Sequence, residues 1–409
     1  MTGQPIAGGR RIAALVLLAG VFVMEGYDIA AMGLAVPRLH EPLGLAPTSF
    51  GWVFSALLIG LGLGGALIAP LGDRFGRRPL IAFGCLAVAA ATLATATATS
   101  IPAFLLWRFV AGVGFGACLP NVSALSAEIA PARMRATIMA VVSAGIPLGI
   151  ALAGIFAPEV VAAAGWQGLF LVPGLLAAVL AAALGYLLQP GPPESTGAAA
   201  TRSSRLPQLD LIRGVWLLPF AVFAAILSLN AMNLYYFNSW LPTVLPLADF
   251  TIDEAARVSG VVQLAGIAIG VAASLGIDRW RPGPTLLLMF GAMAVCFAAI
   301  GLTAPDPLRW RLLLMVGVGG ASAGGMALPA LCAYLFPPRL LSSAVGLGVL
   351  VARLGAIAGP PVGEAMLDGG ASAQTFIVFG AVPAALCALV CLMLPAALKV
   401  RPRQEGAAA

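Results

Sequence analysis

Charged residues are scarce in this chain of 409 residues, where they make up 9% of the sequence, against about a quarter in a typical soluble domain. Hydrophobic residues make up 61%. So little charge excludes an ordinary soluble domain, because the apolar surface would be too large to face water. The sequence therefore predicts an integral membrane protein.

Histidine and cysteine are also few, with one histidine and six cysteines. The single histidine, His40, follows the first apolar stretch, and every cysteine lies inside an apolar stretch, so no disulfide framework is indicated. Cys387 and Cys391 share a helix face, but two thiols without a histidine are weak grounds for a metal site. No Gly-x-x-x-x-Gly-Lys-Ser/Thr loop occurs. We expect no metal, no cofactor and no use of ATP.

Twelve apolar stretches are each long enough to cross a membrane as a helix of about 20 residues. They cover residues 12–36, 48–71, 79–98, 102–127, 136–164, 168–189, 214–245, 255–276, 284–303, 311–336, 340–367 and 371–397. No ten-residue alternation typical of a membrane β-barrel is present. The predicted fold class is thus an all-α integral membrane protein with twelve transmembrane helices, with no room left for a soluble catalytic domain.

Successive loops alternate between few and many basic residues. If the N-terminus is cytoplasmic, sixteen of the 22 lysines and arginines fall in inside loops and tails, and four fall outside. This asymmetry predicts that both termini are cytoplasmic. It also explains the basic isoelectric point of about 9.3 without nucleic-acid binding. Arg10 and Arg11 precede an apolar run too long for a cleaved signal peptide, so we expect that run to remain as the first helix.

The second half of the chain repeats features of the first. The loop 72–79, with Asp73-Arg74, is matched 205 residues later by 277–284, with Asp278-Arg279. Trp107-Arg108 opens one apolar stretch and Trp310-Arg311 opens another. We therefore predict two pseudo-symmetric six-helix bundles, 1–189 and 214–409, the latter with a short cytoplasmic tail. Residues 190–213, rich in proline, glycine and serine, are predicted to form a cytoplasmic linker.

Two carboxylates interrupt the first apolar stretch. Glu25 and Asp28 have no other ionisable neighbour in it, and their spacing of three places both on one helix face. A carboxylate inside a membrane costs several kcal/mol or more, so it is typical of a water-filled cavity or a proton path. These residues indicate an ion-coupled transporter. Glycines at 60–65 and 112–116 also predict close approach of the second and fourth helices.

The loop 72–78 resembles the signature G-x-x-x-D-R-x-G-R-R/K of the major facilitator superfamily. The matching residues are Asp73, Arg74, Gly76, Arg77 and Arg78. The resemblance implies a cytoplasmic gate, in which these arginines meet helix carbonyls and an acidic partner. Glu128, at the inner end of the fourth helix, is the predicted partner. The alternative is that these are simply positive-inside charges.

Within that superfamily, four segments resemble the aromatic acid:proton symporter family. They are 24–28, 116–128, 235–242 and 353–360. Glu25 stands where that family more often has aspartate, although the branch that resembles hydroxyphenylpropionate carriers also has glutamate there. The resemblance implies proton-coupled uptake of a small aromatic carboxylate, such as a hydroxybenzoate or hydroxyphenylpropionate, by alternating access.

Asp28 and Arg108 are expected at similar depth in the first and fourth helices, counted at about 1.5 Å per residue. Because both helices line the cavity in the superfamily, an ion pair between them is feasible. Protonation of Asp28 would break the pair, so Glu25, Asp28 and Arg108 are the predicted proton-coupling residues. A fixed structural pair is the alternative.

Arg353 is expected near the bilayer midplane, where a guanidinium needs an anion such as the substrate carboxylate. Aromatic and amide side chains of the seventh helix complete the predicted substrate site. The other predicted substrate-binding residues are Tyr27, Asn121, Asn230, Asn233, Tyr236, Phe237, Trp240 and Gln263. The alternative is that these residues serve helix packing or lie at the membrane interface.

Two other functions stay open. An exporter that exchanges protons for drugs or metabolites would use the same fold, and no residue fixes the direction of transport. A membrane enzyme or sensor is disfavoured, because a nucleophile with its base, or a metal cluster, is missing. We expect a multi-pass protein of the bacterial inner membrane whose partners are lipid, protons and an aromatic acid, and which is a monomer.

Overall fold

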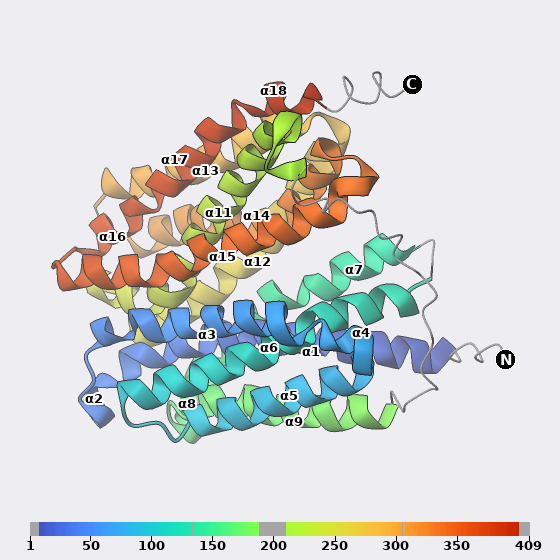
Figure 1. Ribbon diagram of the computed structural model, residues 1–409. Helices are drawn as coiled ribbons and strands as arrows, with labels where there is room; N and C mark the ends of the chain where they lie inside the picture. The colour runs from blue at the N-terminus through green and yellow to red at the C-terminus, as the bar shows by residue number, and fades with distance from the viewer. Residues whose placement is uncertain (1–7, 132–133, 188–209, 305, 401–409) are drawn as a thin grey trace, which may run out of the picture. The chain divides into compact units, whose positions relative to one another are not determined.

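A computed structural model describes residues 8–131, 134–187, 210–304 and 306–400 of the chain (Figure 1). Among these residues twelve helical stretches are long and apolar enough to cross a membrane, and no strand occurs. The predicted fold class is therefore confirmed. The chain divides into two compact units, Met1–Ser195 and Thr196–Ala409. Most of the predicted linker, residues 190–209, lies outside the described residues.

The N-terminal unit contains the first six spans. Its α-helices are α1 (Gly8–Ala35), α2 (His40–Leu43), α3 (Gly51–Leu63), α4 (Leu71–Phe75), α5 (Arg77–Thr95), α6 (Ile101–Ile129), α7 (Arg135–Ser143), α8 (Gly145–Ala164) and α9 (Gly168–Leu187). Short 3-10 turns at η1 (Val36–Arg38) and η2 (Pro47–Phe50) connect the first two spans, and a π-helical turn, η3 (Gly64–Ile68), follows α3.

The C-terminal unit contains the other six spans. Its helices are η5 (Gly214–Trp216), α11 (Leu217–Val244), η6 (Leu245–Ala248), α12 (Ile252–Arg279), α13 (Pro282–Gly301), α14 (Pro307–Leu335), α15 (Pro338–Asp368), α16 (Ala373–Phe379), α17 (Ala381–Cys391) and α18 (Leu394–Leu398).

Both units pair their spans in the same order. In the N-terminal unit α1 packs on α8, α3 on α6, and α5 on α9. In the C-terminal unit the equivalent spans pair as α11 with α15, α12 with α14, and α13 with α17. The repeat seen in the sequence therefore corresponds to a repeated arrangement of six helices.

Glycine makes the tightest of these contacts possible. A Cβ atom at Gly60 of α3 or at Gly64 of η3 would contact the backbone of α6, and one at Gly112 or Gly116 of α6 would contact the backbone of α3. The predicted close approach of the second and fourth spans is thus confirmed, and Figure 1 shows α3 and α6 side by side.

Prolines explain three breaks that the apolar pattern does not reveal. The stretch 136–164 divides into α7 and α8, and the stretch 371–397 divides into three helices. Pro147, Pro383 and Pro395 lie in the first turns that follow these breaks. Because proline has no N–H, it cannot bond back to the preceding turn, and the helix restarts there.

Candidate functional site

A buried ion pair joins Asp28 of α1 to Arg108 of α6. Arg108 Nη1 donates to Asp28 Oδ2 at 2.8 Å, and Nη2 donates to the Asp28 carbonyl oxygen at 3.0 Å. The two side chains are 0% and 1% exposed. The pair that the sequence made feasible is therefore present, whereas its role in proton coupling stays a prediction.

Thr92 of α5 completes the cluster around Asp28. Its Oγ1 donates to Asp28 Oδ1 at 3.0 Å, so each carboxylate oxygen has its own donor. Thr92 is fully buried. Sequence analysis missed this residue, because a threonine among the alanines of 89–98 carries no charge and no spacing signal. The cluster thus unites three different helices of the N-terminal unit.

Glu25 and Tyr27 lie on α1 one turn or less from Asp28. Glu25 is 3% exposed, and it is close enough to Cys118 of α6 to interact with it electrostatically. The buried Tyr27 hydroxyl has no hydrogen-bond partner among the described residues. Glu25 and Asp28 are thus both buried in this conformation. If they exchange protons with water, the protein must adopt another conformation to expose them.

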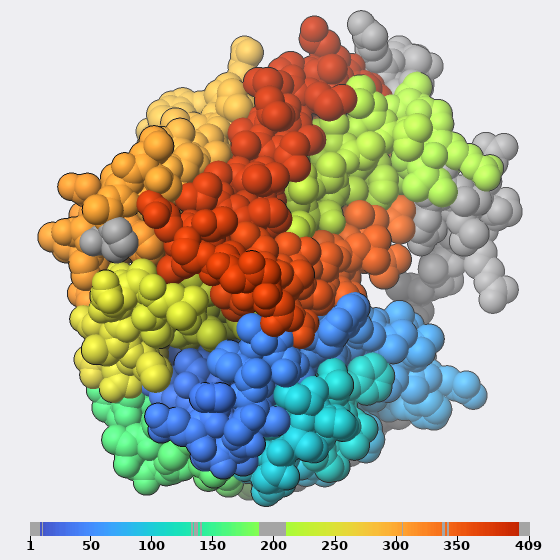
Figure 2. Space-filling model, turned by 90° about the vertical axis from the view of Figure 1, so that its left-hand side faces the viewer, coloured from blue at the N-terminus to red at the C-terminus, as the bar shows by residue number. Residues whose placement is uncertain are grey.

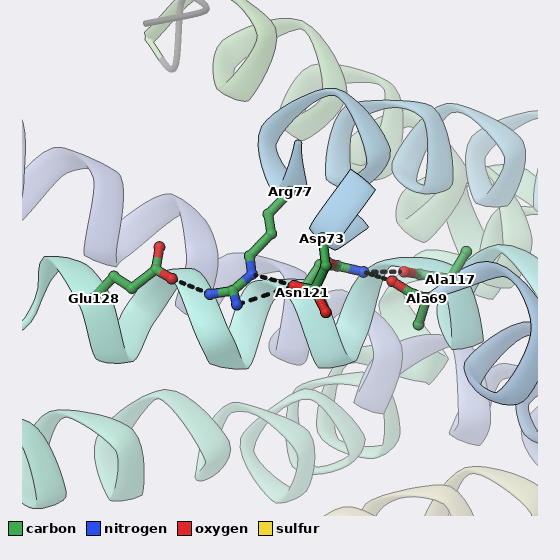
Figure 3. A network of polar contacts seen from close by, with 6 residues as sticks. All are labelled: Ala69, Asp73, Arg77, Ala117, Asn121 and Glu128. Atoms are coloured by element: carbon green, nitrogen blue, oxygen red, sulfur yellow. Dashed lines mark hydrogen bonds and ion pairs between the residues drawn. The ribbon is translucent and has the colours of Figure 1, made fainter. Parts of the chain in front are cut away.

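The signature loop forms a polar network at the ends of α4, α5 and α6 (Figure 3). Arg77 donates to Asp73 Oδ1 from Nε at 3.3 Å and from Nη2 at 3.1 Å, and its Nη1 contacts Glu128. Gly76 has φ of +97°, a conformation that favours glycine. The predicted acidic partner is therefore in contact with the loop, while its function as a gate remains a prediction.

The other two arginines of the loop differ in their surroundings. Arg74 Cζ lies 5.3 Å from the ring centroid of Phe75, a distance suited to a cation–π contact. Arg78 also interacts with its surroundings.

Asn121 of α6 bonds to the segment that immediately precedes this loop. Its Nδ2 donates to the carbonyl oxygens of Ala69, at 3.0 Å, and Ala117, at 2.9 Å (Figure 3). A Cβ at Gly72 would overlap the Asn121 amide. Asn121, predicted for the substrate site, thus holds the turn from η3 to α4 in the structure.

The aromatic residues of α11 lie inside the C-terminal unit. Tyr236 is 1% exposed and its hydroxyl donates to the Phe376 carbonyl oxygen at 2.9 Å. Trp240 is 0% exposed and its Nε1 donates to the Pro360 carbonyl oxygen at 2.8 Å. In this conformation both polar tips bind backbone carbonyls of the same unit.

The remaining predicted residues of α11 are packed in the same way. Asn230 Nδ2 donates to Ala321 O and Asn233 Nδ2 to Gly380 O, each at 3.0 Å, while both Oδ1 atoms are buried without a hydrogen-bond partner among the described residues. Phe237 stacks on a phenylalanine of α13 at 4.8 Å between ring centroids. Each asparagine therefore keeps an unused acceptor.

Gln263 of α12 bridges three helices. Its Nε2 donates to Asn238 Oδ1 of α11 at 2.8 Å, and its Oε1 accepts from Ser322 Oγ of α14 at 2.5 Å. Gln263 is 1% exposed. Asn238 and Ser322 were not predicted, since neither stands out among neighbouring residues.

Arg353 of α15 is half-buried, and it makes no hydrogen bond or ion pair with any described residue of its unit. Its guanidinium therefore keeps five N–H donors for an anion. For metals the described residues offer no cluster of three or more histidine, cysteine, aspartate or glutamate side chains.

Comparison with known proteins identifies the family. Residues 18–360 match the model of the Major Facilitator Superfamily. The chain is 28% identical to the 4-hydroxybenzoate transporter of Pseudomonas putida, over 91% of this chain and 90% of that one. It is 32% identical to the 3-(3-hydroxy-phenyl)propionate transporter of Escherichia coli, over 85% of each chain.

A solved structure of a D-xylose-proton symporter has the same fold, with a TM-score of 0.76, 20% identity, and coverage of 93% of this chain and 97% of that one. These relatives are transporters and not enzymes. With twelve spans and bacterial relatives, the chain is a multi-pass inner-membrane protein that belongs to the Major Facilitator Superfamily.

Proposed function

We propose that this protein imports a small aromatic carboxylate together with protons, by alternating access, with both termini in the cytoplasm. A hydroxybenzoate or a hydroxyphenylpropionate is the proposed substrate, which the names of two relatives support. The observation that carries proton coupling is the buried cluster of Asp28, Arg108 and Thr92.

The free-energy cost of breaking this buried ion pair is large enough to drive a conformational switch. Removing one charge of a buried ion pair costs about 3 to 5 kcal/mol. Protonation of Asp28 would leave Arg108 with its bond to the Asp28 carbonyl oxygen and with no anion. This cost is comparable with the free energy of moving one elementary charge across the membrane, which is roughly 2.3 kcal/mol per 100 mV of membrane potential. A proton can therefore shift the balance between two conformations.

Arg353 is the proposed receptor for the substrate carboxylate. A guanidinium offers two parallel N–H donors that match a carboxylate, and Arg353 has no competing acceptor among the described residues of its unit. The free acceptors of Asn230 and Asn233 are proposed to recognise ring hydroxyls. Tyr27, Asn121, Gln263 and the aromatic residues of α11 are proposed to shape the rest of the site.

Uptake into proteoliposomes tests the function. With acid outside, vesicles that contain the protein should accumulate labelled 4-hydroxybenzoate faster than protein-free vesicles, which control for diffusion of the neutral acid. Carbonyl cyanide uncouplers should abolish the difference. Equal accumulation in both kinds of vesicle would refute import, and proton-driven expulsion would instead favour the exporter.

A further inference from the structure

Three hydrogen-bonded side chains, Asn238 of α11, Gln263 of α12 and Ser322 of α14, form what we call the polar triad. Gln263 is buried, whereas Asn238 and Ser322 are half-buried. Helices α12 and α14 pack on each other, and in Figure 2 the yellow surface, which includes the start of α12, borders the orange surface, which includes the start of α14. The proposed function so far gives no role to Asn238 and Ser322.

Glycine brings Ser322 within reach of Gln263. A Cβ atom at Gly266, one turn after Gln263 on α12, would lie 2.8 Å from the Cβ of Ser322. A Cβ atom at Gly319, one turn before Ser322 on α14, would lie 3.0 Å from the Val262 carbonyl oxygen. The two helices are therefore in close contact at the level of the triad, which fixes the distance between these polar side chains.

The hydrogen bonds of the triad run in one direction. Ser322 Oγ donates to Gln263 Oε1 at 2.5 Å, and Gln263 Nε2 donates to Asn238 Oδ1 at 2.8 Å. These bonds occupy the single hydroxyl proton of Ser322 and the amide oxygen of Asn238. Among the described residues, the Nδ2 donors of Asn238 and the lone pairs of Ser322 Oγ have no hydrogen-bond partner.

The triad lies well inside the membrane-spanning part of its unit. Counted at about 1.5 Å per residue, Gln263 lies roughly 16 Å from the start of α12, and Ser322 roughly 22 Å from the start of α14. By the same count Arg353 lies roughly 22 Å from the start of α15. The triad and the proposed carboxylate receptor are therefore both near the middle of their helices.

The free groups of the triad are poorly suited to face lipid. An amide or hydroxyl group without a hydrogen-bond partner costs free energy in hydrocarbon. The exposed parts of Asn238 and Ser322 are therefore suited to water or to a polar group of a ligand.

A phenolic hydroxyl is complementary to the two ends of the triad, because it both accepts and donates a hydrogen bond. Asn238 Nδ2 can donate to the phenolic oxygen, and Ser322 Oγ can accept from the phenolic O–H. The free side-chain atoms of Asn230 and Asn233 are acceptors only. The triad thus adds the donor that a phenolic oxygen needs.

We propose that Asn238 and Ser322 recognise the hydroxyl group on the substrate ring, and that Gln263 is a positioning residue that orients both. The inference rests on the proposed function for its aromatic acid. An acid without the hydroxyl would leave both groups unpaired, so the protein should prefer the hydroxylated acid.

Binding to the whole protein in nanodiscs, measured by isothermal titration calorimetry at one pH, tests the proposal. The probes are two pairs of acids whose members differ only in the hydroxyl: 4-hydroxybenzoate with benzoate, and 3-(3-hydroxyphenyl)propionate with 3-phenylpropionate. The readout is the ratio of the two dissociation constants within a pair. In at least one pair the wild type should bind the hydroxylated acid about tenfold or more tightly.

Three variants sharpen this test. Asn238→Leu and Ser322→Ala each remove one contact to the hydroxyl, and Gln263→Met removes the group that orients both. Each variant should lower the ratio about fivefold, with a smaller change for the acid without the hydroxyl. A packing role alone would weaken both acids equally and leave the ratio unchanged.

Ser259→Ala is the matched control. Ser259 is also half-buried and lies on α12, and its Oγ donates to the Ala255 carbonyl oxygen of the same helix at 2.8 Å. This variant should keep the wild-type ratio.

Two results would overturn the role of the triad: equal binding of both members of each pair by the wild type, or a wild-type ratio in both Asn238→Leu and Ser322→Ala. Uptake of labelled 4-hydroxybenzoate into proteoliposomes, measured on the same preparation, separates the two proposals. Uptake together with either of these results rejects the triad alone. Absence of uptake and of binding of all four acids rejects the proposed function, and this inference with it.

Discussion

At the scale of single residues, the buried carboxylate of Asp28 has the most defined surroundings. One oxygen accepts from Arg108 and the other from Thr92, and all three side chains are buried. The orientation of the acid is therefore fixed by donors on two other helices. A change in either donor should alter proton coupling without removing the acid itself.

Thr92→Val tests the uncharged donor, since valine has nearly the same shape. A hydrogen bond to a charged group contributes about 1.5 to 3 kcal/mol, so we expect proton-driven uptake to fall about tenfold or more and its pH profile to shift. Thr95→Val is the matched control, because Thr95 is equally buried and bonds to the Ala91 carbonyl oxygen of its own helix. If both variants behave alike, Thr92 has only a packing role.

Arg353→Lys tests the proposed carboxylate receptor. Lysine keeps the charge but loses the two-pronged geometry, so the KM for 4-hydroxybenzoate should rise about tenfold with a smaller change in maximal rate. Arg281→Lys, at an exposed position before α13, should leave KM unchanged. An unaltered KM in Arg353→Lys would remove this residue from the binding site.

At the scale of helices, the C-terminal end of α3 and the η3 turn that follows it contact α6 through glycines. Gly60 and Gly64 meet the backbone of α6, while Gly112 and Gly116 meet that of α3. Such an interface excludes side chains from its centre. Its integrity should therefore depend on each glycine separately.

Gly116→Val should destabilise the protein, because its Cβ would overlap the Leu61 carbonyl oxygen. Overpacking costs about 1 to 3 kcal/mol and more where backbone must move, so the midpoint of thermal unfolding in detergent should fall clearly. Gly62→Val is the control, since no atom lies within 4 Å of the Cβ position there. Equal midpoints for both variants would contradict the packing of α3 on α6.

Glu128→Gln separates a gate from a simple stabilising contact. The side chains of Arg77 and Glu128 are 28% and 53% exposed, so their pairing contributes at most about 1 kcal/mol to folding. We expect an unchanged unfolding midpoint. Uptake should slow severalfold, because the proposed cytoplasmic gate loses the ion pair between Arg77 and Glu128. Glu41→Gln, at an exposed position on α2, is the control, and normal uptake in Glu128→Gln would reject the gate.

Much of the fold was predictable because apolar length and charge placement are visible in the sequence. All twelve spans were found, and Asp28 and Arg108 could be paired because charges are rare in lipid. The breaks near Pro147 and Pro383 were missed, since an apolar run hides a change of direction. The spacing of residues on α11 showed which aromatic side chains share a helix face, but not which groups they contact. The sequence therefore could not reveal that Tyr236 and Trp240 donate to carbonyls of the same unit.

At the scale of the whole molecule, the proposed proton group and the proposed carboxylate receptor belong to different units. Asp28 lies in Met1–Ser195 and Arg353 in Thr196–Ala409. Each unit has its own buried core. We therefore propose that proton and substrate influence each other through movement of one unit against the other, as in transporters built from repeats.

The most direct measurement of the central claim is proton movement driven by substrate. Proteoliposomes that enclose a pH-sensitive dye receive labelled 4-hydroxybenzoate outside, with no pH gradient at the start. The wild type should acidify the interior in step with uptake, beyond the slow change in protein-free vesicles. Asp28→Asn should lose this acidification while it still exchanges labelled for unlabelled substrate. Uptake by the wild type without acidification, or normal acidification by Asp28→Asn, would contradict the account.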